Sequence, residues 1–182
     1  EEEILKFKKE NYDKERHIYK EGSLKLSDEW ILNKLNKLIL EITNNIENYD
    51  LGVALDKIYN FMWNEFCDWY IEMVKPRIYS DNYEIKTNVC YILNYAFGTA
   101  LKLLHPFMPF VTTKIYSELV SYDNKDLMIS NWPEVKKNFS FENEEKLVEQ
   151  LKETIVEIRN VRANMNIHPS KKSELIFVSK SN

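Results

Sequence analysis

The run from Leu51 to Tyr79 constrains the fold more than any other part of the chain. Its apolar residues recur every three or four positions, the spacing that places side chains on one face of a helix. They cover most of the circumference, and a helix of this kind belongs in the middle of a bundle. One apolar side carries Leu51, Leu55, Ile58, Met62, Phe66, Trp69 and Met73, and a second carries Tyr59, Trp63, Tyr70 and Val74.

Only a narrow polar stripe remains on this predicted helix. The simplest interpretation of the stripe is a solvated or hydrogen-bonded seam, because residues three or four apart are neighbours on a helix. The aromatic residues could stack on nucleic-acid bases, but core packing is the better explanation for most of them. The stripe runs through Asn60, Asn64, Asp68, Glu72 and Lys75, and the aromatic residues in question are Trp63, Phe66, Trp69 and Tyr70.

Further helices are predicted before and after this run. Ser27 is expected to cap the first of them, and Asp81 to open the helix that follows the central one. Pro109 suits the first turn of another helix, and the last helix runs from about Glu142 to Met165. The core face of the first helix is predicted to carry Ile31, Leu35, Leu38, Ile42, Ile46 and Tyr49, with Lys34 and Lys37 off that face.

These patterns predict an all-α fold, a bundle of about five helices with a short β element at the C-terminus. Three glycines in 182 residues disfavour a sheet-rich architecture, and this length suits one domain with a sizeable core. We divide the chain into a charged lead-in at 1–26, helical or partly ordered, a bundle at 27–168, and the start of a C-terminal α/β element at 169–182. A lone strand at 174–179 is not stable by itself, so we expect a following element to pair with it.

Five segments together resemble the anticodon-binding helical domain of valyl-tRNA synthetase, a class I aminoacyl-tRNA synthetase. The resemblance covers roughly Leu26 to Phe177. Sister synthetases share the LLHPFMPF and NWPE elements, whereas the run from Asn64 to Tyr79 separates the valyl from the isoleucyl enzymes. The segments are NEFCDWYIEMVKPRIY from Asn64, SDEWILNKLN from Ser27, LKLLHPFMPFVTTKIY from Leu101, ISNWPE from Ile129 and VEIRNVRANMNIHPSKKSELIF from Val156.

The sequence contains no catalytic constellation, and neither its cysteines nor its three histidines form a metal-ligand cluster. The residues Ser170–Ser173 superficially echo the ATP-binding loop of class I synthetases, but they follow the bundle whereas the family's loop precedes it. The resemblance therefore implies a non-catalytic fragment without a cofactor. In the parent enzyme, ATP and a divalent cation would act in a catalytic domain that this fragment lacks.

Seven residues are candidates for tRNA contact. Trp30 stands at a helix start, off the main apolar stripe, where a base could stack on its ring. Lys75 and Arg77 leave the central helix where it bends, and basic groups there can reach a phosphate, although pairing with the helix dipole is nearly as plausible. The stretch from Lys146 to Lys172 contains six basic and three acidic residues, which gives a local charge of +3. Arg159 and Arg162 of this stretch could contact the tRNA, but they could equally pair with acids in the bundle. The full set is Trp30, Lys34, Asn64, Lys75, Arg77, Arg159 and Arg162.

The resemblance implies valine tRNA as the partner, together with the catalytic and editing domains of the same enzyme. We expect a monomeric, cytoplasmic protein, because no apolar run reaches the length of a membrane span and no secretory signal opens the chain. Two alternatives remain open. One is the anticodon-binding domain of an isoleucyl or leucyl enzyme, and the other is a helical protein-interaction scaffold, which the net charge of −4 favours.

Overall fold

The computed structural model describes residues 24–119, 126–168, 170–172, 174 and 176. The chain divides into two compact units, Glu1–Glu145 and Lys146–Asn182, and each is considered by itself. Of the predicted lead-in at 1–26, all but the last three residues lie outside the described part of the chain, so its predicted state stays a prediction.

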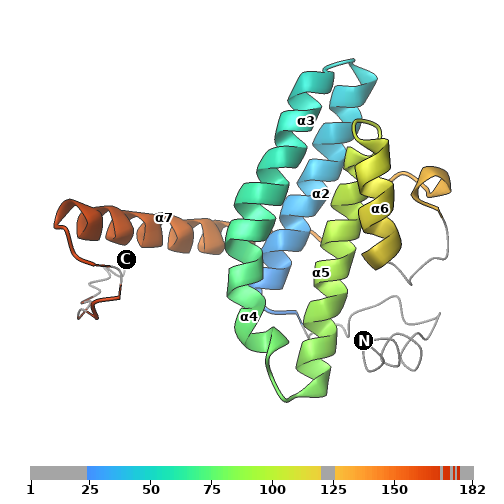
Figure 1. Ribbon diagram of the computed structural model, residues 1–182. Helices are drawn as coiled ribbons and strands as arrows, with labels where there is room; N and C mark the ends of the chain where they lie inside the picture. Colours follow the sequence, from blue (N-terminus) through green and yellow to red (C-terminus); the bar gives the residue numbers. More distant parts are fainter. Residues whose placement is uncertain (1–23, 120–125, 169, 173, 175, 177–182) are drawn as a thin grey trace. The chain divides into compact units, whose positions relative to one another are not determined.

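The described part of the first unit is a helical bundle, which confirms the predicted all-α fold (Figure 1). Its first helix packs against α3, η1 and α5, and α5 also packs against α4 and α6. Short connections at 48–50, 79–82 and 105–108 join helices that lie antiparallel, whereas α3, η1 and α4 follow one another without a break along one helical stretch. The elements are α2 (Leu26–Glu47), α3 (Leu51–Asn60), the π-helix η1 (Phe61–Ile71), α4 (Glu72–Ile78), α5 (Tyr83–Leu104), α6 (Pro109–Leu119) and the short 3-10 helix η2 (Leu127–Ile129).

The ends of the helices follow the predicted positions, but two of the capping residues were predicted wrongly. Asn82, and not Asp81, caps α5, because its side-chain oxygen accepts hydrogen bonds from the backbone N–H groups of Glu84 (3.0 Å) and Ile85 (3.2 Å). Ser27 lies inside the first turn of α2, which begins at Leu26. The stop at His105–Pro106 and the start at Pro109 are as predicted.

The central helix is not one continuous α-helix, because the π-helix η1 separates α3 from α4. In a π-helix each backbone bond spans five residues, so the buried face changes register. Ala54 and Ile58 are buried at a spacing of four, Phe61 and Phe66 follow at five, and the spacing then returns to four. The buried residues along this stretch are Ala54, Ile58, Phe61, Phe66, Tyr70 and Val74.

Part of the two predicted apolar sides of this stretch lies in solvent. Leu51 is 50 % exposed, Leu55 38 %, Tyr59 61 % and Trp63 57 %, so the prediction that the helix is buried on nearly all sides is wrong. The predicted polar stripe, by contrast, is exposed throughout. The predicted core face of α2 is buried at Ile31, Leu35, Leu38 and Ile42, but its last member, Tyr49, is 87 % exposed.

The segment that follows η2 is attached to α2 by hydrogen bonds. The Asn36 amide donates to the carbonyls of Lys136 (2.7 Å) and Phe139 (3.0 Å), and its oxygen accepts from the Lys136 N–H (3.1 Å). Phe139 is 3 % exposed and packs edge-on against the ring of Tyr95, with centroids 5.8 Å apart. This segment therefore has a defined place on the bundle although it contains little regular structure.

The last helix, α7 (Glu142–Asn164), starts in the first unit and continues in the second, as predicted to within a residue. Its second part exposes a series of aliphatic residues, among them Leu151 and Val161. The described residues contain no strand, and most of the predicted β stretch at 174–179 lies outside them. That element therefore stays a prediction.

Candidate nucleic-acid interface

Trp30 does not stand off the core, as the sequence suggested, but is fully buried at 0 % exposure. The neighbouring Asp28 and Ile31 are buried as well, because helices and the connecting segment surround this end of α2. The prediction went wrong because the acids of the first turn were taken as a sign of solvent. In this conformation a base cannot stack on the ring, and Trp30 is a core residue.

Asp28, one of these first-turn acids, binds Arg77, which lies near the C-terminal end of the central helical stretch. The Arg77 guanidinium donates to both carboxylate oxygens, at 2.7 and 2.6 Å, and also to the Ser27 hydroxyl at 3.1 Å. The Tyr70 hydroxyl donates to the same carboxylate at 2.9 Å, and so does the Lys25 backbone N–H at 2.9 Å. Burial, and then the negative charge of Asp28, raise the pKa of Tyr70 well above its ordinary value. Arg77 therefore binds a buried carboxylate of the fold, and we call this contact between Arg77 and Asp28 the clamp.

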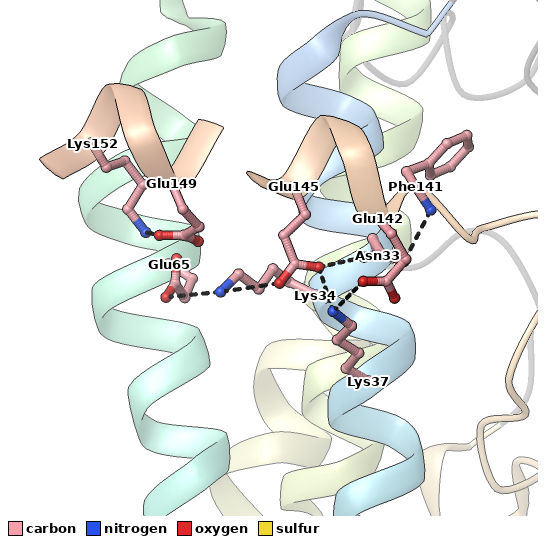
Figure 2. Close-up of polar contacts among 9 residues, drawn as sticks. All are labelled: Asn33, Lys34, Lys37, Glu65, Phe141, Glu142, Glu145, Glu149 and Lys152. Carbon is pink, nitrogen blue, oxygen red and sulfur yellow. Dashed lines mark hydrogen bonds and ion pairs between the residues drawn. The ribbon is translucent and has the colours of Figure 1, made fainter. Parts of the chain in front are cut away.

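Lys34 also lies close to two carboxylates (Figure 2). Its Nζ is 3.8 Å from an oxygen of Glu65 on η1 and 3.6 Å from an oxygen of Glu145 on α7. Lys37 donates to Glu145 at 2.8 Å and to Glu142 at 3.1 Å. Its hydrogen bond to Glu145 is the main cause that raises the pKa of Lys37.

Asn33 completes this group, which we call the α2 anchor: Asn33, Lys34 and Lys37 of α2 with Glu142 and Glu145 of α7. The Asn33 amide donates to the Glu145 carboxylate, and its oxygen accepts from the Phe141 N–H at 3.1 Å (Figure 2). Asn33 is 3 % exposed. The anchor thus joins the first turn of α7 to α2 through several donors that converge on one acid.

Asn64 and Lys75 differ from these residues because both are exposed on the outer side of η1 and α4. The Asn64 amide donates to the side-chain oxygen of Asn60 at 3.0 Å, and Lys75 pairs with Glu72 one turn earlier. Contacts of this kind between exposed side chains contribute little stability. Both groups can exchange their present partners for an RNA ligand at small cost.

Two exposed aromatic residues, Tyr59 and Trp63, lie on the same outer side. The sequence analysis did not consider Tyr59 as a site residue, and for Trp63 it preferred core packing to base stacking. The rings of Tyr59 and Trp63 are nearly parallel, with centroids 6.5 Å apart and an interplanar angle of 7°. Their positions continue the spacing of Leu51 and Leu55, so the pattern was visible in the sequence, but it was read as a second core face. We call Tyr59, Asn60, Trp63 and Asn64 the outer strip.

The two arginines of α7 belong to the second unit and differ in their surroundings. Arg162 donates to the backbone carbonyls of His168 (3.1 Å) and Lys171 (2.7 Å), so it holds the segment after the helix. Arg159 is exposed on the same helix. Lys171 and Lys172 are exposed as well, which keeps this part of the unit basic.

The described residues offer no sign of other chemistry. They contain no group of three or more histidine, cysteine, aspartate or glutamate side chains that could hold a metal ion. Cys67 and Cys90 are free, and burial raises the pKa of both thiols, which disfavours the reactive thiolate. None of the described helices is long and apolar enough to cross a membrane.

Comparison with known proteins identifies the family. Residues 28–177 match the family model described as the anticodon-binding domain of tRNA ligase. The chain belongs to this family. Among curated proteins, Valine--tRNA ligase of Clostridium acetobutylicum is 42 % identical over 178 residues, 98 % of this chain and 20 % of that protein. The enzymes of the same name from Thermotoga maritima and Staphylococcus aureus are 41 % and 37 % identical, over 82 % and 87 % of the chain and 17 % and 18 % of those proteins. The chain therefore spans about a fifth of the length of these relatives.

The seven residues predicted to contact tRNA have two kinds of surroundings. Trp30, Lys34, Arg77 and Arg162 are buried or engaged in contacts that hold the fold together. Asn64, Lys75 and Arg159 are exposed. Asn64 lies next to the exposed Trp63.

Proposed function

We propose that this chain holds the anticodon stem-loop of valine tRNA, as the anticodon-binding part of a valine–tRNA ligase that acts in translation. The observation that carries the proposal is the relative named Valine--tRNA ligase that aligns with 98 % of the chain at 42 % identity. On this proposal the protein is monomeric and cytoplasmic. Valine activation and editing, with ATP and a divalent cation, belong to other domains of the same enzyme.

The outer strip is the proposed site for the unstacked bases of the anticodon. Single-stranded RNA is read by stacking bases on aromatic side chains and by hydrogen bonds to their edges. Trp63 and Tyr59 offer exposed rings in nearly parallel planes, and the Asn64 amide beside them can donate to and accept from a base edge. In this proposal Trp63 takes the stacking role that the sequence suggested for Trp30.

Basic residues would hold the RNA backbone around these bases. Lys75, eleven positions after Asn64, is exposed on the same helical stretch. Arg159, which belongs to the second unit, is exposed on α7 and is considered a separate candidate for a phosphate contact. The exposed carboxylates of Asp56 and Asp68 lie on the same helical stretch, so the interface is not a uniformly basic surface. Such a surface suits the reading of a few bases better than unspecific binding along a duplex.

The test is binding of a valine anticodon stem-loop to the chain, measured by fluorescence anisotropy at several salt concentrations. We expect the affinity to fall as salt rises, because phosphate contacts release counterions. Changing the second or third anticodon base, which all valine codons share, should weaken binding. Trp63→Ala should cost roughly 1–3 kcal/mol of binding free energy, the value of one base stacked on an aromatic ring. The matched control is Trp132→Ala, because Trp132 is also a partly exposed tryptophan, at 38 %, but lies on the connecting segment.

Two results would contradict the proposal. Equal or tighter binding of isoleucine or leucine stem-loops would assign the chain to another class I enzyme. Absence of binding at low salt, for every stem-loop tested, would favour a protein-interaction scaffold, for which the net charge of −4 is the best argument.

A further inference from the structure

We propose that the tip of the α2–α3 hairpin is a docking surface for a basic amphipathic helix, supplied by the part of the ligase that lies outside this chain. The inference rests on the proposed function, because the helix is taken from the other domains of that enzyme. The surface consists of the exposed side chains of Tyr49, Leu51 and Leu55, which we call the tip patch. The tip patch lies entirely within the first compact unit.

Tyr49 stands at a backbone position that suits glycine. Its φ is 61°, in the left-handed region that residues with a Cβ disfavour. The turn after α2 has the two hydrogen bonds of a Schellman motif. The Tyr49 N–H donates to the Ile46 carbonyl at 3.1 Å, and the Asp50 N–H donates to the Asn45 carbonyl at 2.8 Å. The position of the tyrosine in this motif is usually taken by glycine.

The tyrosine gains no packing in return for this conformation, because it is 87 % exposed. Residues held in a disfavoured backbone conformation cluster at sites that contact ligands or partners. The exposed ring of Tyr49 is therefore a candidate contact.

The apolar side chains that follow Tyr49 also face solvent. Leu51 and Leu55 are both exposed, and because they are four positions apart on α3 they share one face of it. Side chains at this spacing form a ridge, which packs between the ridges of another helix. Neither leucine has a polar group that could read a base edge, so this end of α3 suits a protein partner better than RNA.

The charge around the tip patch is negative. From Glu41 to Asn60 the chain has four acidic residues and one lysine, which gives a net charge of −3. The lysine is already paired, since the Lys57 Nζ lies 2.5 Å from a Glu41 oxygen. The three remaining acids are exposed, and none of the ion pairs among the described residues involves them. They are Glu47, Asp50 and Asp56.

Two of these acids do not stabilise the helices at which they lie. Asp50 is the N-cap of α3, but its side chain accepts no capping hydrogen bond. Glu47 lies in the last turn of α2, where the helix dipole disfavours an acid and no basic residue offsets it. Their carboxylates are therefore available to a partner.

The negative charge decides between the occupants of such a surface. It repels an RNA backbone or an anionic membrane. A second copy of this chain would bring the same negative charge to the interface, so like charges would oppose each other. A helix with an apolar face flanked by lysine or arginine fits both the ridge and the charge. Because this chain covers only 20 % of the Clostridium acetobutylicum relative, the proposed ligase has other domains from which such a helix can come.

The first measurement is thermal unfolding of the isolated chain. Tyr49→Gly should raise the melting temperature by about 2–4 °C, because glycine adopts a positive φ without strain. The matched control is Tyr79→Gly, since Tyr79 is also an exposed tyrosine at a helix end but has a φ of −91°. The control should not raise the melting temperature. An unchanged or lower melting temperature for Tyr49→Gly would show that the tyrosine carries no structural cost, and the proposal would be wrong.

The second measurement is binding of a synthetic amphipathic helix of leucine and lysine to the isolated chain, followed by fluorescence anisotropy. We expect an affinity that falls as salt rises and is mostly lost in the double variant Leu51→Gln, Leu55→Gln. The matched control is Val111→Gln, Ile115→Gln on α6, a pair with the same spacing and similar exposure, which should keep the affinity. An equal loss in both pairs would overturn the proposal, and so would equal binding of a peptide with glutamate in place of lysine.

The third measurement identifies the source of the helix. The chain replaces the aligned segment of the Clostridium acetobutylicum ligase, and the photo-crosslinker p-benzoylphenylalanine replaces Tyr49 or, as a control, Tyr79. We expect position 49 to crosslink to a segment of the ligase outside this chain, in which lysine or arginine flanks apolar residues. Position 79 should give far less of this product. A crosslink only to RNA, to a second copy or to a segment without basic residues would overturn the proposal.

Failure of the proposed function has a different signature. The chain would not bind the valine stem-loop, and the chimeric enzyme would not charge tRNA with valine. The melting temperatures and the peptide affinities would still report on the tip patch. These two measurements also decide the proposal if the chimeric enzyme does not fold.

Discussion

The clamp between Asp28 and Arg77 gives the most direct test of how this fold is held together. Substitution of Arg77 by methionine keeps a long side chain but removes two charged donors from a carboxylate that is 1 % exposed. Asp28 would keep only the Tyr70 hydroxyl and the Lys25 N–H as donors. A buried carboxylate that loses its cation is left with an uncompensated charge.

The expected magnitude follows from this arrangement. Removal of one partner of a buried ion pair costs about 3–5 kcal/mol. The Arg77 side chain is 18 % exposed, so water screens the pair in part, and we expect the lower end of that range. Tyr70→Phe removes a single hydrogen bond to the same carboxylate and should cost about 1.5–3 kcal/mol. A double-mutant cycle of Asp28→Asn and Arg77→Met measures the coupling between the two side chains. The double variant should lose less unfolding free energy than the two single variants together, by about 0.5–3 kcal/mol.

Urea unfolding monitored by circular dichroism measures these free energies, provided that the slope with urea is the same in all variants. The matched control is Lys75→Met, two residues earlier, where an exposed lysine pairs with an exposed glutamate. A loss below about 1 kcal/mol for Arg77→Met, or additive effects in the cycle, would refute the clamp. If the variant instead kept its stability and lost RNA affinity with a flatter salt dependence, Arg77 would be a phosphate contact, as the sequence first suggested.

Three further predictions concern single side chains. Trp30→Ala should destabilise the chain by roughly 3–5 kcal/mol, because it empties a fully buried site. Trp63→Ala should change the unfolding free energy by no more than about 1 kcal/mol, because its side chain is 57 % exposed. Glu29→Gln should raise the stability at pH 7, and this gain should fade as the pH falls toward 4.5. Thermal or urea unfolding of each variant, repeated at several pH values for Glu29, measures all three.

The sign of the Glu29 prediction follows from its pKa. Burial, and then the negative charges of Glu144 and Asp28, raise the pKa of Glu29 above 4.5 in the folded chain. The folded state therefore binds the proton more tightly than the unfolded chain, and ionised Glu29 weakens the fold at pH values above both pKa values. A Gln variant that is less stable than the parent at pH 7 would contradict this reasoning. A stable Trp30→Ala variant, or a strongly destabilised Trp63→Ala variant, would reverse the assignment of those residues to core and surface.

The helices and their limits could be predicted because their signals are local. Proline and the apolar spacing on α5 and α6 act within a few residues, and the predicted stop and start at His105–Pro106 and Pro109 are found. The core face of α2 was likewise predicted, from Ile31 to Ile42. Asp81 and Asn82 are adjacent residues that both suit the N-cap of a helix, and the sequence analysis chose Asp81 although Asn82 caps α5.

The candidate site was harder to predict, because its residues take their roles from partners distant in the sequence. Arg77 binds Asp28 across 49 positions, and Asn33 meets Glu145 across 112. A basic residue without an acidic neighbour in the sequence can thus pair with a distant carboxylate in the fold. Lys34 and Arg77 both do so. The outer strip was missed because the apolar positions Tyr59 and Trp63 were interpreted as part of a second core face, whereas both side chains are more than half exposed.

The sequence by itself determined an all-α chain, the approximate limits of its helices, and membership of a family, because periodicity, caps and motifs are written in neighbouring residues. Only the tertiary structure decided which of the polar and aromatic residues remain available to a ligand. Packing of the central helical stretch leaves Trp63 57 % exposed, and packing around α2 encloses Trp30 and Asp28. Exposure and ion pairing depend on what lies opposite each side chain, and that is fixed only when the helices pack.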